Sequence, residues 1–219
     1  MQNPNYQAVL FDLDGTLLDT IDDITDLMNS VLAQFGFGPH TPEDYKKYIG
    51  DGIHNSLLRA LPEGSSEELL DKILDRAIRE FATWQPVKTK PYDGISELLD
   101  ELSSRKLKMA VLSNRPEVST IILVQHLLSK WKFDCVMGAS QKFPLKPDPA
   151  GALEASRRLG VPPKNFLYLG DSNTDMKTAV SVGMYPVGVL WGFRPREELV
   201  ESGAKALLER PRDLIEMLG

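Results

Sequence analysis

Short apolar runs recur along the chain and are separated by stretches with the spacing of helices. These runs cover residues 8–11, 109–112, 135–137, 166–169 and 186–190. Runs of this length that are apolar throughout are typical of strands buried on both faces of a sheet. Between the later runs, apolar side chains recur every three or four residues, as they do on one face of a helix. Alternating strands and helices predict an α/β fold: a Rossmann-like parallel sheet with helices on both faces.

The first strand interrupts this alternation, because the next convincing core strand begins only near Lys108. Most of the intervening segment has helical periodicity, with breaks at residues 36–42, 50–52 and 62–66. Residues 85–94 are rich in proline and glycine and are typical of a linker that returns to the core. We therefore predict a small α-helical cap domain at residues 18–87, inserted after the first strand. Residues 1–17 and 88–219 then form the core.

Polar side chains follow four of the predicted strands. In open parallel sheets, ligands bind beyond the carboxyl ends of the strands, so these positions are candidates for a site. They are Asp12 and Asp14, Ser113 and Asn114, Lys146, and Asp171 and Asp175. Taken singly, each has an ordinary explanation as a turn residue, a helix cap or a surface lysine.

The combination is harder to explain structurally. Carboxylates that a sheet brings together repel one another unless a cation or shared protons relieve them. A hard divalent cation with oxygen ligands, Mg²⁺ in particular, fits such a group. A lysine with hydroxyl and amide donors would hold an anion opposite the metal. These parts, together with an exposed carboxylate nucleophile, are typical of a phosphoryl-transfer site.

Four segments together carry a resemblance to a known family. Residues 12–16 (DLDGT), 113–114 (SN), 146–149 (KPDP) and 170–175 (GDSNTD) resemble, in order and spacing, the four motifs of the haloacid dehalogenase-like hydrolase superfamily. The predicted helical insertion is similar to the cap domain of that family. Residues 48–53 (YIGDGI) and 190–194 (LWGFR) are most similar to phosphoglycolate phosphatase-like members.

The resemblance implies a Mg²⁺-dependent phosphatase that acts through an aspartyl phosphate on Asp12. Its substrate would be a small phosphorylated metabolite, namely a phosphoglycolate-like ester or a sugar or polyol phosphate. Asp14 would protonate the leaving oxygen and then deprotonate water. Crowding by other carboxylates suggests a raised pKa for Asp14. The resemblance also implies that Mg²⁺ is bound by Asp12, the backbone carbonyl of Asp14, Asp171 and Asp175. It implies that the phosphoryl group is bound by Ser113, Asn114 and Lys146.

The loop of the cap is expected to contact the leaving group of the substrate. Its candidate specificity residues are Gly50, Asp51, Gly52 and His54. Glycines there would let the backbone approach a small ligand closely. The charge of Asp51 would repel a carboxylate on the leaving group. This predicts a preference for a neutral or hydroxylated leaving group over phosphoglycolate.

Composition limits the partners and the location. The chain has 25 Lys and Arg residues against 31 Asp and Glu residues, a formal charge of −6 at pH 7. A negative surface argues against nucleic acid or an anionic membrane as a partner. No apolar run approaches the ~18 residues of a membrane span, and no signal peptide is evident. We therefore expect a cytoplasmic protein, monomeric by default, with a homodimer as the alternative.

Three other functions remain open at this point. A sugar-phosphate mutase would also keep Asp14, although such enzymes usually place a basic residue where the cap loop has Asp51. A protein that binds a phosphorylated ligand without catalysis would retain the same motifs. A signalling receiver module would need neither Asp14 nor a cap. Dehalogenases and phosphonate-cleaving members lack the equivalent of Asp14, so that residue argues against them.

Overall fold

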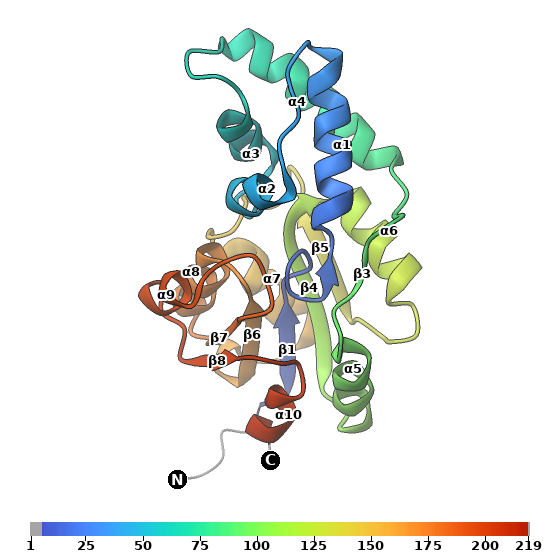
Figure 1. Cartoon of the computed structure of the whole chain (residues 1–219). Coiled ribbons are helices and arrows are strands. Elements are labelled where there is room, and N and C mark those ends of the chain that lie inside the picture. Colours follow the sequence, from blue (N-terminus) through green and yellow to red (C-terminus); the bar gives the residue numbers. More distant parts are fainter. Residues whose placement is uncertain (1–5, 219) are drawn as a thin grey trace.

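The computed structural model describes residues 6–218, and its core is a six-stranded sheet in which every neighbouring pair is parallel. In spatial order the strands are β5 (Cys135–Ala139), β4 (Lys108–Pro116), β1 (Ala8–Phe11), β6 (Phe166–Gly170), β7 (Tyr185–Val189) and β8 (Ala206–Leu208). Strand β1 lies between β4 and β6, with Phe11 opposite Val111 on one side and Leu169 on the other. This arrangement confirms the predicted α/β fold (Figure 1).

Helices cover both faces of the sheet, because alternate residues of a buried strand point to opposite sides. Val9 and Phe11 pack in the cluster that contains α5 and α6, whereas Ala8 and Leu10 pack in the cluster that contains α7 and α8. None of the helices within residues 6–218 is long and apolar enough to cross a membrane. The core helices are α5 (Ile95–Ser104), α6 (Glu117–Leu127), α7 (Ala150–Leu159), the 3-10 helix η1 (Pro163–Asn165), α8 (Asn173–Val182), α9 (Arg196–Glu201) and α10 (Asp213–Leu218).

Four helices between β1 and α5 form a helical insertion, α1 to α4, above the carboxyl ends of the strands (Figure 1, top). It has a hydrophobic cluster of its own, which includes Met28, Leu57 and Ile73. The elements are β2 (Leu18–Asp19), α1 (Ile21–Gln34), α2 (Pro42–Tyr48), α3 (Ile53–Ala60), α4 (Glu67–Thr83) and β3 (Lys90–Pro91). A division into separate domains at residues 18 and 87 stays a prediction, and its outermost residues, 1–5 and 219, lie outside the described residues.

The start and the end of the insertion are fastened together beside the sheet. Strands β2 and β3 pair antiparallel, with Leu18 opposite Pro91. Asp23, buried in the first turn of α1, accepts hydrogen bonds at Oδ2 from the backbone N–H groups of residues 87–89 and from the hydroxyl of Thr89, at 2.6–3.2 Å. Hydrogen bonds to an ionised carboxylate are stronger than neutral ones. The first helix of the insertion is therefore tied to the segment that returns to the core.

Candidate active site

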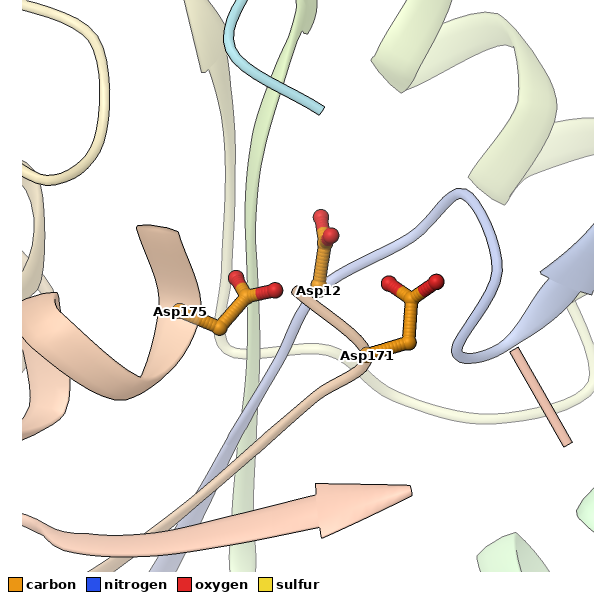
Figure 2. A group of neighbouring side chains, drawn as sticks. All are labelled: Asp12, Asp171 and Asp175. Carbon is orange, nitrogen blue, oxygen red and sulfur yellow. The ribbon is translucent and has the colours of Figure 1, made fainter. Parts of the chain in front are cut away.

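Three buried aspartates meet at the carboxyl ends of β1 and β6. Asp12 follows β1, Asp171 follows β6 and Asp175 lies in the first turn of α8. One oxygen of each carboxylate lies within 4.8 Å of those of the other two. Figure 2 shows all three carboxylates pointing in the same direction, away from the strands. The pairing of β1 with β6 brings together residues that are far apart in the sequence.

Local structure fixes two of these carboxylates. Asp175 accepts hydrogen bonds at Oδ2 from the backbone N–H and the hydroxyl of Ser172, at 3.1 and 2.6 Å, in a capping box at the start of α8. The backbone N–H of Phe193 donates to Asp171 Oδ2 at 2.7 Å. A side chain at Gly15 or Gly192 would collide with Asp171. Glycine at these two positions therefore keeps the space that the carboxylate needs.

Lys146 is a buried cation that bridges two of the three aspartates. Its ammonium lies 2.8 Å from Asp12 Oδ1 and 2.8 Å from Asp175 Oδ1, and it donates to the carbonyl of Leu112 at 3.0 Å. Burial alone would lower the pKa of Lys146, but the charges of Asp12 and Asp175 raise it well above its ordinary value. Lys146 therefore stays charged. All three of its N–H groups have partners within the chain.

One ammonium does not balance three carboxylates. Burial and the charge of Asp175 raise the pKa of Asp12 well above its ordinary value, although Lys146 opposes this. Burial and Asp175 also raise the pKa of Asp171, to about 7. The metal-free cluster therefore retains protons near neutral pH. A divalent cation with oxygen ligands would replace those protons, so the residues present fit Mg²⁺.

These shifts predict how the stability of the metal-free protein depends on pH. A carboxyl with a raised pKa in the folded state stabilises the fold at low pH and ceases to do so as pH rises through that pKa. The Asp171 contribution is thus lost as pH rises through about 7. We expect the melting temperature in chelator to fall from about pH 5.5 to about pH 7, because the free energy of unfolding decreases by up to ~1.4 kcal/mol per pH unit for each proton.

Thermal melts with and without Mg²⁺ would check this prediction. Because metal and protons compete for the same carboxylates, stabilisation by Mg²⁺ should increase with pH. Asp171→Asn is the matched variant, and its melting temperature in chelator should vary less with pH. A melting temperature in chelator that rises from pH 5.5 to 8 would contradict the prediction.

Asp14 is not part of the group of three aspartates and is paired with Arg115. The guanidinium contacts both carboxylate oxygens, with Nη2 at 2.7 Å and Nε at 3.0 and 3.1 Å. Burial raises the pKa of Asp14, but the charge and hydrogen bonds of Arg115 outweigh it and lower the pKa below its ordinary value. The expectation of a raised pKa for Asp14 is therefore wrong, because the guanidinium of Arg115 lies in direct contact with its carboxylate. Contact between its backbone carbonyl and Mg²⁺ stays a prediction.

The sequence analysis did not select Arg115. The side chain is buried, and its Nη1 donates to the hydroxyl of Ser119 at 3.0 Å. The guanidinium also lies over the rings of Phe81 and Trp84, at 5.0 and 5.8 Å from their centroids. Arg115 thus joins Asp14 to the end of α4 in the insertion. Arg115 could have been selected from the sequence, because it directly follows Ser113 and Asn114 at the end of a predicted strand.

Asn114 uses its amide to connect three segments. Its Oδ1 accepts from the backbone N–H of Lys146 at 2.8 Å, and its Nδ2 donates to the carbonyls of Lys146 and Gly50 at 3.0 and 2.9 Å. A side-chain amide has two N–H groups, and here both are occupied. In this arrangement Asn114 has no donor free for a phosphoryl oxygen. Ser113 lies next to it, and its Oγ accepts from the backbone N–H of Arg115 at 3.1 Å.

A cavity lies between the insertion and the strand ends. Its polar lining includes Asp12, Asp14, Ser113, Asn114, Arg115, Asp171 and Arg194, and its apolar lining includes Ile24, Met28, Ile49, Ile53, Phe81 and Phe193. Lys146 and Asp175 are buried and are not part of the lining. Of the predicted loop residues, Gly50 and Gly52 line the cavity, whereas Asp51 and His54 do not. The structure thus brings most of the predicted residues to one cavity.

The premise about Asp51 needs correction. Arg59 contacts its carboxylate through two nitrogens, at 2.7 and 2.5 Å. The negative charge is therefore offset, and it lies outside the cavity lining. Repulsion of a charged leaving group by Asp51 has no basis in this geometry. His54 is exposed and its ring contacts only the side chain of neighbouring Asn55 among the hydrogen bonds of the described residues.

Arg194 ends the segment 190–194 that carried part of the resemblance, although it was not among the predicted site residues. It follows β7 in the core, and its guanidinium donates to backbone carbonyls of the insertion, those of Lys46 and Ile49. Its Nε also lies 3.3 Å from Glu198. Together with Asn114, which binds the Gly50 carbonyl, Arg194 holds the loop at residues 49–52 over the cavity. The described structure therefore has the insertion closed on the core.

Comparisons with known proteins agree with this geometry. Residues 9–189 match the family described as haloacid dehalogenase-like hydrolase. A phosphoglycolate phosphatase of Aquifex aeolicus is 30% identical over 97% of this chain and 96% of its own. An N-acetylmuramic acid 6-phosphate phosphatase of Pseudomonas aeruginosa is 29% identical over 100% and 97%. A solved structure of a phosphoglycolate phosphatase candidate from Lactobacillus delbrueckii subsp. bulgaricus has a TM-score of 0.90 at 30% identity and covers 98% of both chains.

The match extends over most of the chain and includes all four motifs, at residues 12–16, 113–114, 146–149 and 170–175, whereas residues 190–194 lie just beyond it. The relatives cover nearly all of the chain, including the helical insertion. The chain therefore belongs to the haloacid dehalogenase-like hydrolase family, and its activity is that of a phosphatase.

Proposed function

We propose that this phosphatase is Mg²⁺-dependent and hydrolyses a small phosphate monoester through an aspartyl phosphate on Asp12. The observation that carries the proposal is the position of Asp12. Its carboxylate lines the cavity, lies within 4.8 Å of two other carboxylates and is 2.8 Å from a buried lysine. A carboxylate so placed can act as a nucleophile.

In the first step, an oxygen of Asp12 attacks phosphorus, and the bond between phosphorus and the leaving oxygen breaks. The leaving oxygen takes a proton from Asp14, which lines the same cavity. Since Arg115 favours the ionised form of Asp14, protonation of Asp14 must precede this step. Lys146 offsets the charge of Asp12 and keeps its carboxylate in place.

In the second step, water attacks phosphorus, Asp14 accepts a proton from that water, and the bond between Asp12 and phosphorus breaks. Arg115 lowers the pKa of Asp14 and so favours its ionised form, which is the form that accepts a proton. Asp12, Asp171 and Asp175 would hold Mg²⁺, which would supply positive charge to offset that of the phosphoryl oxygens. The closed insertion keeps bulk water away from the aspartyl phosphate.

Phosphoglycolate is the first substrate to test, because the relatives at 30% identity carry that name. The substrate named for the relative at 29%, N-acetylmuramic acid 6-phosphate, also has a carboxylate on the part that leaves. Both arginines that line the cavity are cations, and the only acidic residue of the predicted loop is paired with Arg59. We therefore favour an acidic leaving group. A cytoplasmic location and a monomeric state stay predictions.

A panel of phosphorylated metabolites tests the proposal, with relative kcat/KM as the measurement. It should include both named substrates, neutral polyol and sugar phosphates, and an aryl phosphate. Release of phosphate from the aryl ester would distinguish an enzyme from a binding protein. Conversion of one sugar phosphate into an isomer without release of phosphate would indicate a mutase instead.

Removal of the metal should abolish turnover. Activity should fall to background in excess chelator and return with Mg²⁺, because the excess negative charge of Asp12, Asp171 and Asp175 would otherwise oppose an anionic substrate. Ca²⁺ should bind and inhibit, because its longer and more variable coordination misplaces the phosphoryl group. Phosphate release at matched ionic strength is the measurement. Full activity in excess chelator would show that turnover does not require a metal ion.

A further inference from the structure

Arg115 has hydrogen-bonding capacity that its contacts within the protein do not use. An arginine guanidinium carries five N–H groups. Nε–H and one N–H of Nη2 are directed to Asp14, and one N–H of Nη1 is directed to Ser119. One N–H on each Nη nitrogen thus remains without a hydrogen-bond partner among residues 6–218. Arg115 lines the cavity, which is where a ligand could meet these donors.

The arginine is also held rigidly. Asp14 occupies the edge formed by Nε and Nη2, and the rings of Phe81 and Trp84 lie at 5.0 and 5.8 Å from the guanidinium carbon. The side chain is 2% exposed, so bulk water does not compete for its remaining donors. A fixed, desolvated guanidinium loses little entropy when it binds a carboxylate. The fork of two N–H groups matches the two oxygens of a carboxylate.

The position of Arg115 relative to the reaction points to one part of the substrate. Asp14 is the group proposed to protonate the leaving oxygen, and Arg115 is bonded directly to it. An atom group attached to the leaving oxygen therefore lies next to Arg115, whereas the phosphoryl group lies toward Asp12. Lys146, the other buried cation of the site, pairs with Asp12 at 2.8 Å.

We propose that Arg115 is a specificity-determining residue that binds a carboxylate on the leaving group. This inference rests on the proposed phosphatase function and adds to it the class of substrate: phosphate esters of small hydroxy acids. The free N–H groups on Nη1 and Nη2 receive the carboxylate while Nε and Nη2 remain on Asp14. Trp84 and Phe81, at the end of α4, fix the arginine only while the insertion lies over the core. Recognition of the carboxylate therefore depends on the closed arrangement.

The test compares phosphoglycolate with 2-hydroxyethyl phosphate, which has a neutral hydroxyl in place of the carboxylate. The wild type should have at least a tenfold higher kcat/KM for phosphoglycolate. Arg115→Gln should reduce this ratio by roughly 10- to 100-fold, the range for hydrogen bonds to a charged group. Arg115→Lys keeps the charge but not the fork, and it should fall between the two. Arg79→Gln makes the same charge change at an exposed site on α4 and should leave the ratio unchanged.

The ratio separates recognition from a merely structural role. If Arg115→Gln slows both substrates equally, Arg115 only positions Asp14 and the proposal is overturned. If the melting curve shows that Arg115→Gln does not fold, Arg115→Lys becomes the test. A ratio of the two kcat/KM values in Arg115→Lys that equals the wild-type ratio then overturns the proposal. A wild type without preference for phosphoglycolate also overturns it while leaving the phosphatase function intact. If the wild type hydrolyses none of the three esters, namely phosphoglycolate, 2-hydroxyethyl phosphate and an aryl phosphate, the proposed phosphatase function itself is rejected.

Discussion

Replacement of Asp12 by Asn is expected to reduce steady-state turnover by at least about 10⁴-fold, since an amide oxygen cannot form the acyl phosphate. The fold should survive the change. An Asn side chain at this position can still accept from Lys146, and the variant removes one of the three clustered carboxylates, of which two contact the ammonium of Lys146. We therefore expect a melting temperature in chelator equal to or above that of the wild type.

Phosphate release from the best substrate of the panel, together with thermal melts, would test the prediction for Asp12. Asp75→Asn is a suitable control, because it makes the same substitution at an exposed site on α4 and should keep full activity. Intact-mass measurement after rapid quenching should find a phosphorylated wild type and an unmodified Asp12→Asn protein. Activity of the variant within tenfold of the wild type would exclude Asp12 as the nucleophile.

Replacement of Lys146 by Met should have the second largest effect, and it should affect both activity and stability. Activity is expected to fall by roughly 10³-fold, the scale for loss of one preorganised electrostatic contact. Removal of the ammonium leaves Asp12 and Asp175 buried without their cation, which typically costs about 3–5 kcal/mol. The loss should be greatest above neutral pH, because protonation of the carboxylates at lower pH relieves it.

Chemical denaturation of Lys146→Met at pH 5.5 and pH 8, in chelator, would measure the stability term. Lys164→Met serves as the control, since Lys164 is exposed on η1 and its loss should change neither stability nor activity. Mg²⁺ should partly restore the stability of Lys146→Met, because the metal supplies charge to the same carboxylates. Equal free energies of unfolding for wild type and variant at pH 8 would contradict the prediction.

Most of the parallel sheet could be predicted because its strands are buried on both faces. Residues 8–11 and 166–169 are apolar throughout, and β1 and β6 occupy them almost unchanged. The short edge strand β8 was not predicted. It has only three residues, of which Ala206 and Leu207 are only partly buried, so it lacks the apolar run that marks the central strands. Its existence depends on pairing with β7, which sequence periodicity does not reveal.

The site was predictable to the extent that backbone topology determines it. Asp12 and Asp171 meet because β1 pairs with β6, and strand ends can be found from the sequence. The ion-pair and hydrogen-bond partners in the site depend instead on side chains that meet although they are far apart in the sequence. Arg115 lies 101 residues from Asp14, and Arg194 lies 145 residues from Ile49. The charge of Asp51 was misjudged for a different, local reason: Arg59 is only 8 residues away, and periodicity does not show that its side chain turns back toward Asp51.

The antiparallel pair of β2 and β3 has a consequence for how this protein can diverge. Leu18 and Pro91 are opposite each other, so any segment between them has to span only about 5 Å, the separation of a single strand pair. The entropy of closing such a loop depends weakly on its length. Recombination can therefore exchange one continuous stretch of the gene for another of different size without disturbing the sheet. Substrate selectivity can change by replacement of a module while the phosphoryl-transfer residues are inherited intact.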